Sequence, residues 1–246
     1  MVAEREVISG PLGVLYVVGT PIGNLSDISF RAIEILRSAD IIACEDTRRT
    51  RKLLTYYELS SGARLISLHE HNEESQINEI VTHLESGRQV ALVSDAGMPT
   101  ISDPGFKLID ALLSRELEVT VIPGPSSVLA ALALSGFASY RFCFEGFLPL
   151  KKSTRERRLE EIANEVRTIV IFESPYRIVR TMGDLRNYLE ETRRVFVVKE
   201  ITKVHETIWR GSIGSLDPFS SASPASLKGE FVIVIEGKFT KDHNQS

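Results

Sequence analysis

Residues 89–113 read QVALVSDAGMPTISDPGFKLIDALL, and the order of features in this stretch predicts the fold of the first half of the chain. An apolar run is followed by a loop with two Ser-Asp pairs, two glycines and two prolines, and then by a helix-like segment. Apolar runs without polar alternation are typical of strands buried on both faces of a parallel sheet. The stretch therefore predicts a strand, a shaped loop and a helix, the repeating unit of an α/β protein.

The same alternation extends in both directions along the first half of the chain. Strands are expected at 13–19, 40–44, 63–68, 89–94 and 118–124. Helices are expected at 29–39, 46–59, 73–86 and 103–115, the first with Ser26 or Asp27 available as its cap and the third closed by Gly87. Short apolar strands separated by helices predict a parallel-type sheet covered on both faces.

The second half has a different rhythm. Helices are expected at 125–136, 153–165 and 174–191, and strands at 141–147, 168–173, 194–200, 205–211 and 229–237. The last strands follow one another with only the polar loop SSASPAS between them, which predicts a mixed, partly antiparallel sheet. We therefore expect an N-terminal α/β domain at 1–123 and a C-terminal one at 124–246, ending in a short frayed tail, GKFTKDHNQS.

Composition excludes several classes of protein. The chain has 246 residues, is 43% hydrophobic and carries a net charge of -4. The protein therefore has no overall positive charge that would indicate nucleic-acid binding by its whole surface. Its longest apolar runs are too short to span a bilayer, and the N-terminal MVAEREVISG does not resemble a signal peptide. Cys44 and Cys143 lie far apart and are expected to be buried free thiols in a reducing cytoplasm. The pair His69 and His71 lacks a third placed ligand, so no metal is expected.

The loop after the strand at 89–94 holds the first candidate site, because ligands of parallel α/β sheets bind at the carboxyl ends of strands. Asp103 or Ser102 can cap the next helix, with Pro104 in its first turn, and we favour this structural role for Asp103. Asp95 has no helix to cap immediately, and Gly97 lets a ligand approach the backbone. We therefore expect Asp95 and Gly97 to contact a ligand.

Other strand ends carry acids, and two basic runs lie near them. Glu45 and Asp46 follow the strand at 40–44, where Asp46 or Thr47 as a helix cap is the competing interpretation. Four strand-end acids from both halves could converge on a cleft between the domains: Glu45, Asp95, Glu173 and Glu200. The basic residues could bind a polyanion or form ordinary solvated helix faces: Arg48, Arg49, Arg51, Lys52, Lys151, Lys152, Arg155, Arg157 and Arg158.

Nine motifs occur in an order that resembles a known family. They are TPIGNLSDIS, CEDTRRT, LHEHNEE, ALVSDAGMPTISDPG, PGPSSVLAAL, FEGFLP, FESPYRI, KEITK and KGEFVIVIEG. This series resembles the ribosomal RNA small-subunit methyltransferase I family, within the tetrapyrrole methylase-like superfamily, from about residue 15 to residue 237. The resemblance implies two α/β domains with S-adenosylmethionine in the cleft between them, usually in a homodimer. It also implies methylation of the ribose 2′-oxygen of a cytidine in the decoding region of 16S rRNA in the small ribosomal subunit.

The resemblance also implies roles for particular residues. Those that look like cofactor contacts are Pro21, Asp95, Gly97, Met98, Ser126, Ser127, Phe172, Glu173, Lys199, Lys228 and Glu230. A general base for the 2′-hydroxyl would add about 10²–10⁴-fold to the rate, and Glu200, Glu45 and Asp46 are candidates. The basic residues named above would bind RNA. A methylase of a tetrapyrrole-like small molecule or of a protein side chain, on the same fold, remains the alternative, and the acidic pI disfavours a non-enzymatic RNA-binding factor.

Overall fold

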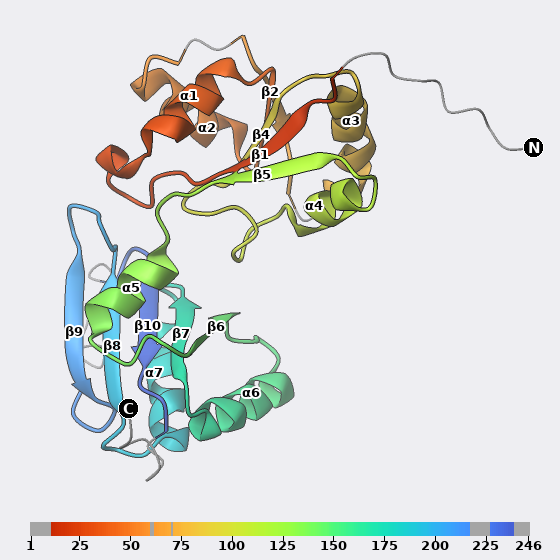
Figure 1. The fold of residues 1–246 in the computed structure, drawn as a ribbon. Helices are drawn as coiled ribbons and strands as arrows, with labels where there is room; N and C mark the ends of the chain where they lie inside the picture. Colours follow the sequence, from red (N-terminus) through yellow and green to blue (C-terminus); the bar gives the residue numbers. More distant parts are fainter. Residues whose placement is uncertain (1–10, 60–61, 70, 217–226, 239–246) are drawn as a thin grey trace, which may run out of the picture. The chain divides into compact units, whose positions relative to one another are not determined.

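A computed structural model describes residues 11–59, 62–69, 71–216 and 227–238. The chain forms two compact units, Met1–Ser126 and Ser127–Ser246, each of which is described here by itself (Figure 1). The N-terminal segment 1–10, the SSASPAS loop and most of the expected C-terminal tail lie outside the described residues. No helix in the described ranges is long and apolar enough to cross a membrane.

Unit 1 is built on a five-stranded sheet. Its strands are β1 (Val14–Val18), β2 (Ile41–Cys44), β3 (Arg64–Ser67), β4 (Val90–Val93) and β5 (Glu118–Ile122). They run in the order β3-β2-β4-β1-β5 and every pair is parallel, which confirms the predicted parallel sheet. All four residues of β2 and all four of β4 are buried, which explains why these strands show no polar alternation in the sequence.

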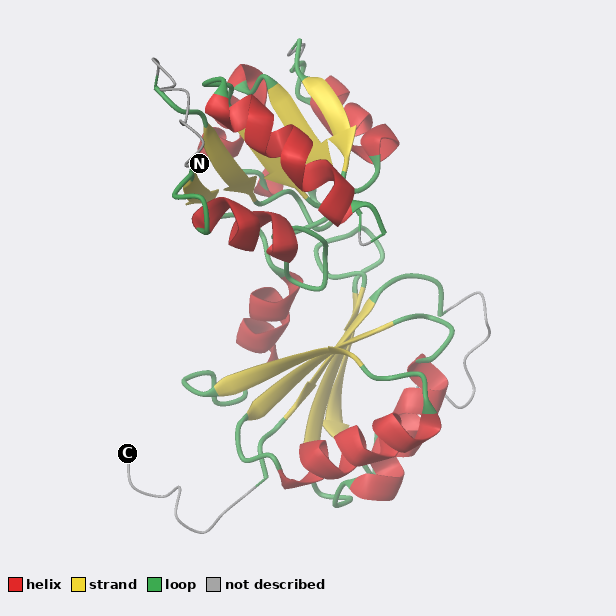
Figure 2. Ribbon diagram, turned by 90° about the vertical axis from the view of Figure 1, so that its right-hand side faces the viewer, coloured by secondary structure: helices red, strands yellow, loops and turns green. Residues whose placement is uncertain are grey.

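Helices cover both faces of this sheet (Figure 2). The short 3-10 helix η1 (Leu25–Asp27) leads to α1 (Phe30–Ser38), which packs with α2 (Thr47–Tyr56) in one apolar cluster. On the opposite face, α3 (Glu73–Glu85) packs with α4 (Phe106–Leu113) in a second cluster. The neighbouring strands β1 and β4 therefore lead to helices on opposite faces, which makes the carboxyl edge between them a topological switch point.

Two of the predicted helix caps are wrong. Helix α1 is capped by Ser29, whose hydroxyl accepts from Ala32 N at 3.1 Å, while Ser26 and Asp27 belong to η1. Helix α4 begins at Phe106 with Gly105 at its N-cap, so Pro104 precedes the helix and neither Asp103 nor Ser102 holds the cap position.

The acceptor for the first turn of α4 comes from another helix. Glu73 Oε1 receives hydrogen bonds from Gly105 N at 3.1 Å and Leu108 N at 3.0 Å, and Glu73 is buried. A carboxylate beside the N–H groups of a first helical turn, which have no partner within the helix, also suits the positive end of the helix dipole. Helix α3 thus fixes both the start of α4 and the end of the loop that precedes it.

Unit 2 contains the predicted mixed sheet. Its strands are β6 (Phe142–Phe147), β7 (Thr168–Glu173), β8 (Arg194–Lys199), β9 (Thr207–Ser212) and β10 (Phe231–Ile235), in the order β6-β7-β10-β8-β9. Only the β6–β7 pair is parallel. Helices α6 (Lys152–Asn164) and α7 (Ile178–Tyr188) pack on one face in a single apolar cluster, and α5 (Ser127–Ser135) lies against β7 and β10 (Figures 1 and 2).

Both cysteines are free thiols among the described residues. Cys44 is buried, as expected, and burial raises the pKa of its thiol. Cys143 is only partly buried, but desolvation raises its pKa to about 11. Neither thiol is therefore a thiolate at neutral pH.

Candidate functional site

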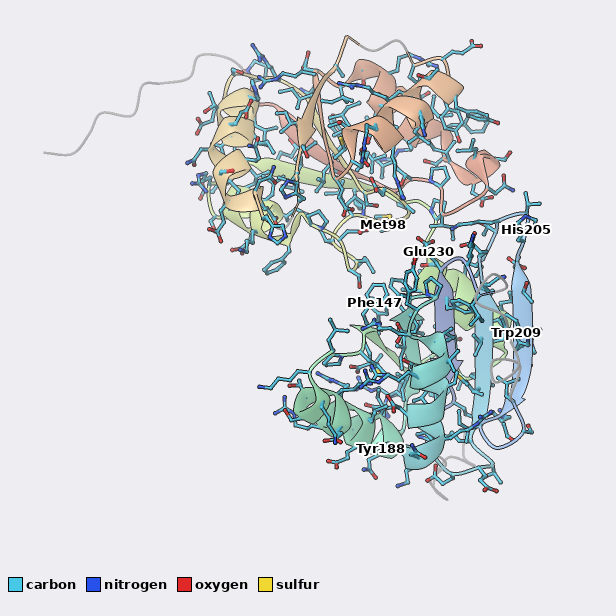
Figure 3. All side chains as sticks on the ribbon, turned by 180° about the vertical axis from the view of Figure 1, so that it is seen from behind. Met98, Phe147, Tyr188, His205, Trp209 and Glu230 are labelled. Carbon is cyan, nitrogen blue, oxygen red and sulfur yellow. The ribbon has the colours of Figure 1, made fainter. Side chains whose placement is uncertain are left out.

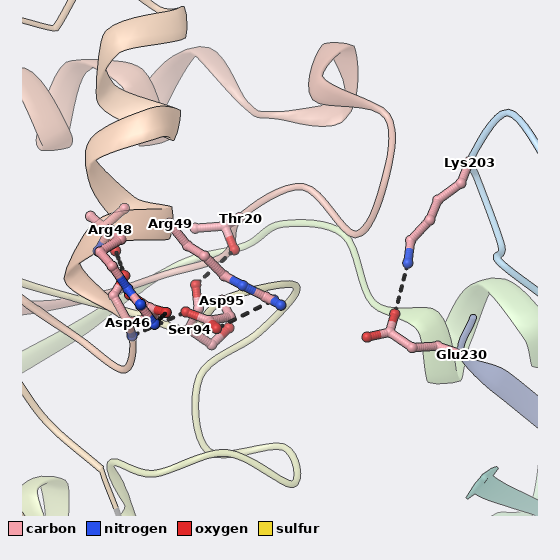
Figure 4. Close-up of polar contacts among 9 residues, drawn as sticks. Thr20, Asp46, Arg48, Arg49, Ser94, Asp95, Lys203 and Glu230 are labelled. Atoms are coloured by element: carbon pink, nitrogen blue, oxygen red, sulfur yellow. Dashed lines mark hydrogen bonds and ion pairs between the residues drawn. The ribbon is translucent and has the colours of Figure 1, made fainter. Parts of the chain in front are cut away.

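Loops from neighbouring strands are joined at the carboxyl edge of the unit 1 sheet. The residue after β1, Thr20, pairs with Gly97 in the loop after β4 through two backbone hydrogen bonds, 2.9 and 3.1 Å long. The buried Thr20 hydroxyl lies 3.3 Å from Ser94 O and 3.4 Å from Gly97 O, and the Ser94 hydroxyl donates to Gly97 O at 3.2 Å (Figure 4). These contacts hold residues 94–97 in one shape.

Glycines make the close packing at this edge possible. Gly97 has φ +86°, where a side chain is disfavoured, and a Cβ there would lie 3.2 Å from Ile22 Cγ2. A Cβ on Gly19 would lie 2.6 Å from Gly124 Cα and 2.7 Å from Met98 Sδ. The loops after β1, β4 and β5 therefore touch through backbone, with Met98 packed against Gly19.

Asp95 connects the loop after β4 to the start of α2. Its Oδ1 accepts from Asp46 N at 3.2 Å, and its Oδ2 lies 3.3 Å from an Arg49 guanidinium nitrogen (Figure 4). The Asp95 side chain is 20% exposed and that of Arg49 is 64% exposed, so both remain open to solvent. A carboxylate and a guanidinium thus stand side by side at the edge of the sheet.

Asp46 has a structural role at the start of α2. It is the N-cap of α2, where Oδ1 accepts from Arg48 N at 2.8 Å, and its two oxygens also receive Nε and a terminal nitrogen of Arg48 at 3.0 and 2.7 Å. These hydrogen bonds from Arg48 hold the pKa of Asp46 far below its usual range. The competing cap interpretation of Asp46 is therefore confirmed, and a carboxylate held in this way is a poor proton acceptor.

Glu45 precedes this cap at the end of β2. Its side chain is half-buried, and its backbone carbonyl accepts from the Ser67 hydroxyl at 3.3 Å. The other predicted contacts of unit 1 are Pro21, buried after Thr20, and Ser126, half-buried at the end of the unit. Ser127 begins α5 in unit 2.

Unit 2 has a hollow of about 680 Å³ at the carboxyl end of β8 and the start of β10. Glu200, Lys199, Lys228 and Gly229 line it together with the segment that leads into β9. The predicted residues of the KEITK and KGEF motifs are therefore brought together within unit 2.

Glu200 is firmly paired beside this hollow. Its Oε1 accepts from Glu230 N at 2.9 Å and lies 2.9 Å from Lys203 Nζ. Lys203 Nζ also contacts Glu230 Oε2 at 2.9 Å (Figure 4). Burial by itself would raise the pKa of Glu200, but the hydrogen bonds from Lys203 and Glu230 N outweigh it and the pKa is lowered. Glu200 is therefore a weaker base than an unpaired glutamate.

The Glu173 carboxylate is engaged inside unit 2, so its predicted contact with the cofactor does not come from the side chain. Its carboxylate is fully buried, 0% exposed, and accepts from Ser174 N, Arg177 Nε and the Thr181 hydroxyl at 2.7, 2.8 and 2.6 Å. Those bonds and the lack of exposed side-chain surface give the carboxylate a structural role. Its neighbour Phe172 is half-buried and packs edge-to-face on Phe144.

The basic residues divide into two groups. Arg155 is buried, 3% exposed, and pairs with Asp184 at 2.7 Å, so the prediction that it binds RNA is wrong. The others are exposed: Arg48, Arg49, Arg51, Lys52, Lys151, Lys152 and Arg157, with Arg158 half-buried between acids. Among the residues that the structure describes, no group of three or more His, Cys, Asp and Glu could hold a metal.

Two residues of the site escaped prediction from the sequence. Thr20 carries the hydroxyl that ties two loops together, and its signal was a polar residue directly after an apolar strand. Glu73 anchors the far end of the 94–105 loop, and nothing in its local sequence distinguishes it from Glu74. Only the approach of α3 to α4 separates the two.

Comparison with known proteins identifies the family. A sequence model of the Tetrapyrrole (Corrin/Porphyrin) Methylases matches residues 14–217. The chain belongs to this family. It is 44% identical over 232 residues to "Ribosomal RNA small subunit methyltransferase I" of Synechocystis sp., covering 94% of this chain and 81% of that protein. It is also 44% identical over 228 residues to the Thermotoga maritima protein of the same name, covering 92% of this chain and 100% of that protein.

Solved structures agree on the fold. The methyltransferase CobJ superposes with a TM-score of 0.68 at 19% identity, over 92% of this chain and 95% of that one. A cobalt precorrin-4 methyltransferase gives 0.66 at 20% identity, over 91% and 94%. The predicted family and α/β class are confirmed. Tetrapyrrole methylases and rRNA methyltransferases use S-adenosylmethionine as the methyl donor, which confirms the predicted cofactor.

Proposed function

We propose that this tetrapyrrole methylase family member transfers a methyl group from S-adenosylmethionine to the ribose 2′-oxygen of a cytidine in the decoding region of 16S rRNA. The support from sequence is the 44% identity, over nearly the whole chain, to proteins named ribosomal RNA small subunit methyltransferase I. The structural observation that carries the proposal is the position of Asp95. Its carboxylate connects the loop after β4 to the basic helix α2 through Asp46 N and Arg49.

The residues at the unit 1 edge fit the methionine part of the donor. A carboxylate and a guanidinium 3.3 Å apart, each partly exposed, are complementary to an ammonium and a carboxylate on one carbon. We therefore assign Asp95 to the donor's ammonium and Arg49 to its carboxylate. Gly97 packs closely on Ile22 and keeps this loop tightly turned. We place the rest of the donor along the backbone of the loop, with Pro21 and Met98 as its apolar neighbours.

When bound, the donor supplies an already activated methyl group, so the protein's task is to orient the 2′-oxygen and exclude water. Lowered pKa values make Asp46 and Glu200 poor acceptors of the 2′-hydroxyl proton. We propose Glu45 as the general base, because it stands at the end of β2 beside the loop that Asp95 anchors. Glu45→Gln should lower kcat by about 10²–10⁴-fold, with the affinity for S-adenosylmethionine unchanged.

Exposed cations on α2 and at the start of α6 provide phosphate contacts. Helix α2 presents Arg51 and Lys52 to solvent, and Lys151 and Lys152 open α6. Each phosphate neutralised by such residues adds to the dependence of affinity on salt. Reversing the charge of Lys52 or Lys151 should weaken RNA binding and flatten the salt dependence, and a small-molecule or protein methylase would not respond.

The decisive experiment uses radiolabelled S-adenosylmethionine with 30S particles and with free 16S rRNA, both lacking the methyl group. Label should enter rRNA, and the phosphodiester bond after the modified cytidine should resist alkali, because a 2′-O-methyl group removes the nucleophile of RNA cleavage. Label confined to base atoms would reject the 2′-oxygen. Label in a tetrapyrrole or protein instead of rRNA would support the alternative methylase.

Asp95→Asn and Asp95→Ala test the donor site separately, by calorimetry with S-adenosylmethionine and no RNA. Loss of a charge-assisted hydrogen bond predicts a fall in affinity of about tenfold or more. Unchanged affinity in both variants would reject the assignment of Asp95.

We also propose a homodimer, which light scattering of the purified protein will test.

A further inference from the structure

A group of aromatic rings lies at the end of β6 and β7 in unit 2, and one of them is largely uncovered. Phe144 and Phe147 both pack edge-to-face on Phe172, with ring centroids 4.8 and 5.8 Å apart. Phe147 is nevertheless 51% exposed. Figure 3 labels Phe147 on this part of the unit.

The backbone of β6 is altered to place Phe147 there. In a regular strand, residues three apart point to opposite faces, so Phe144 and Phe147 could not both contact one ring on a neighbouring strand. The pairing of β6 with β7 shifts between Phe144 and Phe147, and Gly146 has φ +61°. This irregularity is what brings both rings onto Phe172 and turns Phe147 outward.

Arg177 completes the exposed group. Its guanidinium carbon lies over the Phe147 ring, 5.7 Å from the centroid. Its Nε donates to Glu173 Oε1 at 2.8 Å, and a terminal nitrogen donates to Leu148 O at 3.2 Å. These contacts hold the Arg177 guanidinium over the Phe147 ring and also hold the backbone of Leu148, the residue after Phe147.

A buried polar network holds this arrangement from behind. The Thr181 hydroxyl donates to Glu173 Oε2 at 2.6 Å, and Arg155 donates to that hydroxyl at 2.8 Å. Arg155 also reaches Pro149 O at 3.5 Å. Burying charges costs desolvation, and well-packed apolar residues often stabilise a fold as much or more. A network that ends on the carbonyls of the Phe147–Pro149 segment is better explained by the positioning of that segment than by stability.

The surroundings of Phe147 combine exposed rings and cations. Tyr176, next to Arg177, is 96% exposed, and Leu150, at the end of the same loop, is 73% exposed. Lys151 and Lys152 follow directly and are also exposed. Exposed rings interleaved with cations are typical of surfaces that bind single-stranded nucleic acid, where bases stack on rings and cations meet phosphates.

We infer that Phe147, backed by Arg177, is a stacking platform for an unpaired nucleobase of the rRNA substrate, with the exposed Tyr176 next to Arg177 in the chain. The inference rests on the proposed function for the identity of the RNA, and it adds a contact that recognises a base instead of a phosphate. Stacking accepts any base, so the platform contributes affinity and register while the sequence is read elsewhere.

The test compares Phe147→Ala and Phe147→Trp with Tyr140→Ala, which removes an exposed ring just before the other end of β6. The probes are 30S particles lacking the methyl group and a single-stranded RNA oligonucleotide of mixed sequence. Phe147→Ala should weaken binding of both by about 5- to 150-fold, Phe147→Trp should retain it, and Tyr140→Ala should match the wild type. The affinity for S-adenosylmethionine should stay constant in all three.

Four results would overturn the inference. Equal RNA binding by Phe147→Ala and Tyr140→Ala would show that no base stacks there. Weakened S-adenosylmethionine binding with normal RNA binding would assign the ring to the methyl donor, and a changed oligomeric state with normal RNA binding would assign it to self-association. Absence of methyl transfer to rRNA by the wild type would reject the proposed function alone, because the binding assay requires no catalysis; absence of RNA binding by the wild type would reject both.

Discussion

Removal of the Glu73 carboxylate should loosen the start of α4 together with the end of the loop that carries Asp95. Glu73 projects from α3 and is 5% exposed. Its Oε1 alone accepts from Gly105 N at 3.1 Å and from Leu108 N at 3.0 Å. No residue at the N-cap of α4 provides a side-chain acceptor, because Gly105 occupies that position.

The size of the effect follows from the two donors. Glu73→Ala leaves both N–H groups buried without their acceptor, and each such group costs about 1–3 kcal/mol, so a loss of about 2–6 kcal/mol is expected. Glu73→Gln keeps an oxygen in place and loses the charge. Because charge-assisted hydrogen bonds are roughly twice as strong as neutral ones, its cost should be about 1–2 kcal/mol.

Glu74 provides a matched control on the same helix. It pairs with Lys107 of α4 at 2.6 Å, but its side chain is 77% exposed, and exposed ion pairs contribute little to stability. Glu74→Ala should therefore change stability much less than Glu73→Ala, although both remove a carboxylate that joins α3 to α4.

Native-state hydrogen exchange measures the effect at the relevant amides, without assuming that two units unfold as one. In Glu73→Ala the amides of Gly105 and Leu108 should exchange faster, in Glu73→Gln by an intermediate factor, and in Glu74→Ala at the wild-type rate. Equal exchange in the Glu73 and Glu74 variants would refute the reasoning.

Three further outcomes are expected. Gly97→Ala should lower the melting temperature, because a left-handed φ of +86° costs a side chain about 1–2 kcal/mol, whereas Gly183→Ala inside α7, where a Cβ meets nothing within 4 Å, should raise it. Hydrogen bonds from Arg167 lower the pKa of Glu165 from 4.5 to about 2. The stabilisation from this pair is therefore present above pH 4.5 and is lost as the pH falls towards 2. Arg167→Gln should flatten that part of an acid-unfolding curve, and an unchanged curve would contradict the pairing. Desolvation raises the pKa of Cys143 to about 11, so iodoacetamide at pH 8 should alkylate it far more slowly than in unfolded protein.

Much of the fold could be predicted because it depends on the pattern of apolar and polar residues within short segments. The uniformly apolar runs of β2 and β4 indicated strands covered on both faces, and the structure pairs both in parallel. Adjacent strands without a helix indicated the mixed sheet of unit 2. The N-cap at Asp46 was also visible, because a short acidic side chain before a helix bonds to groups two residues away.

The sequence by itself determined the order of strands and helices, the two kinds of sheet and the family motifs, because hydrophobic period and turn chemistry act over a few residues. Only the tertiary structure decided which charged side chains are available to a ligand. Arg155 is spaced like its exposed neighbours in a basic run, and Glu173 ends a strand as Asp95 nearly does. Arg155 and Glu173 are buried because α6, α7 and β7 pack together and bring Asp184 and Thr181 within hydrogen-bond distance. The partners of a charged side chain, and the loss of solvent around it, come from segments distant in sequence, so a local sequence pattern does not predict them.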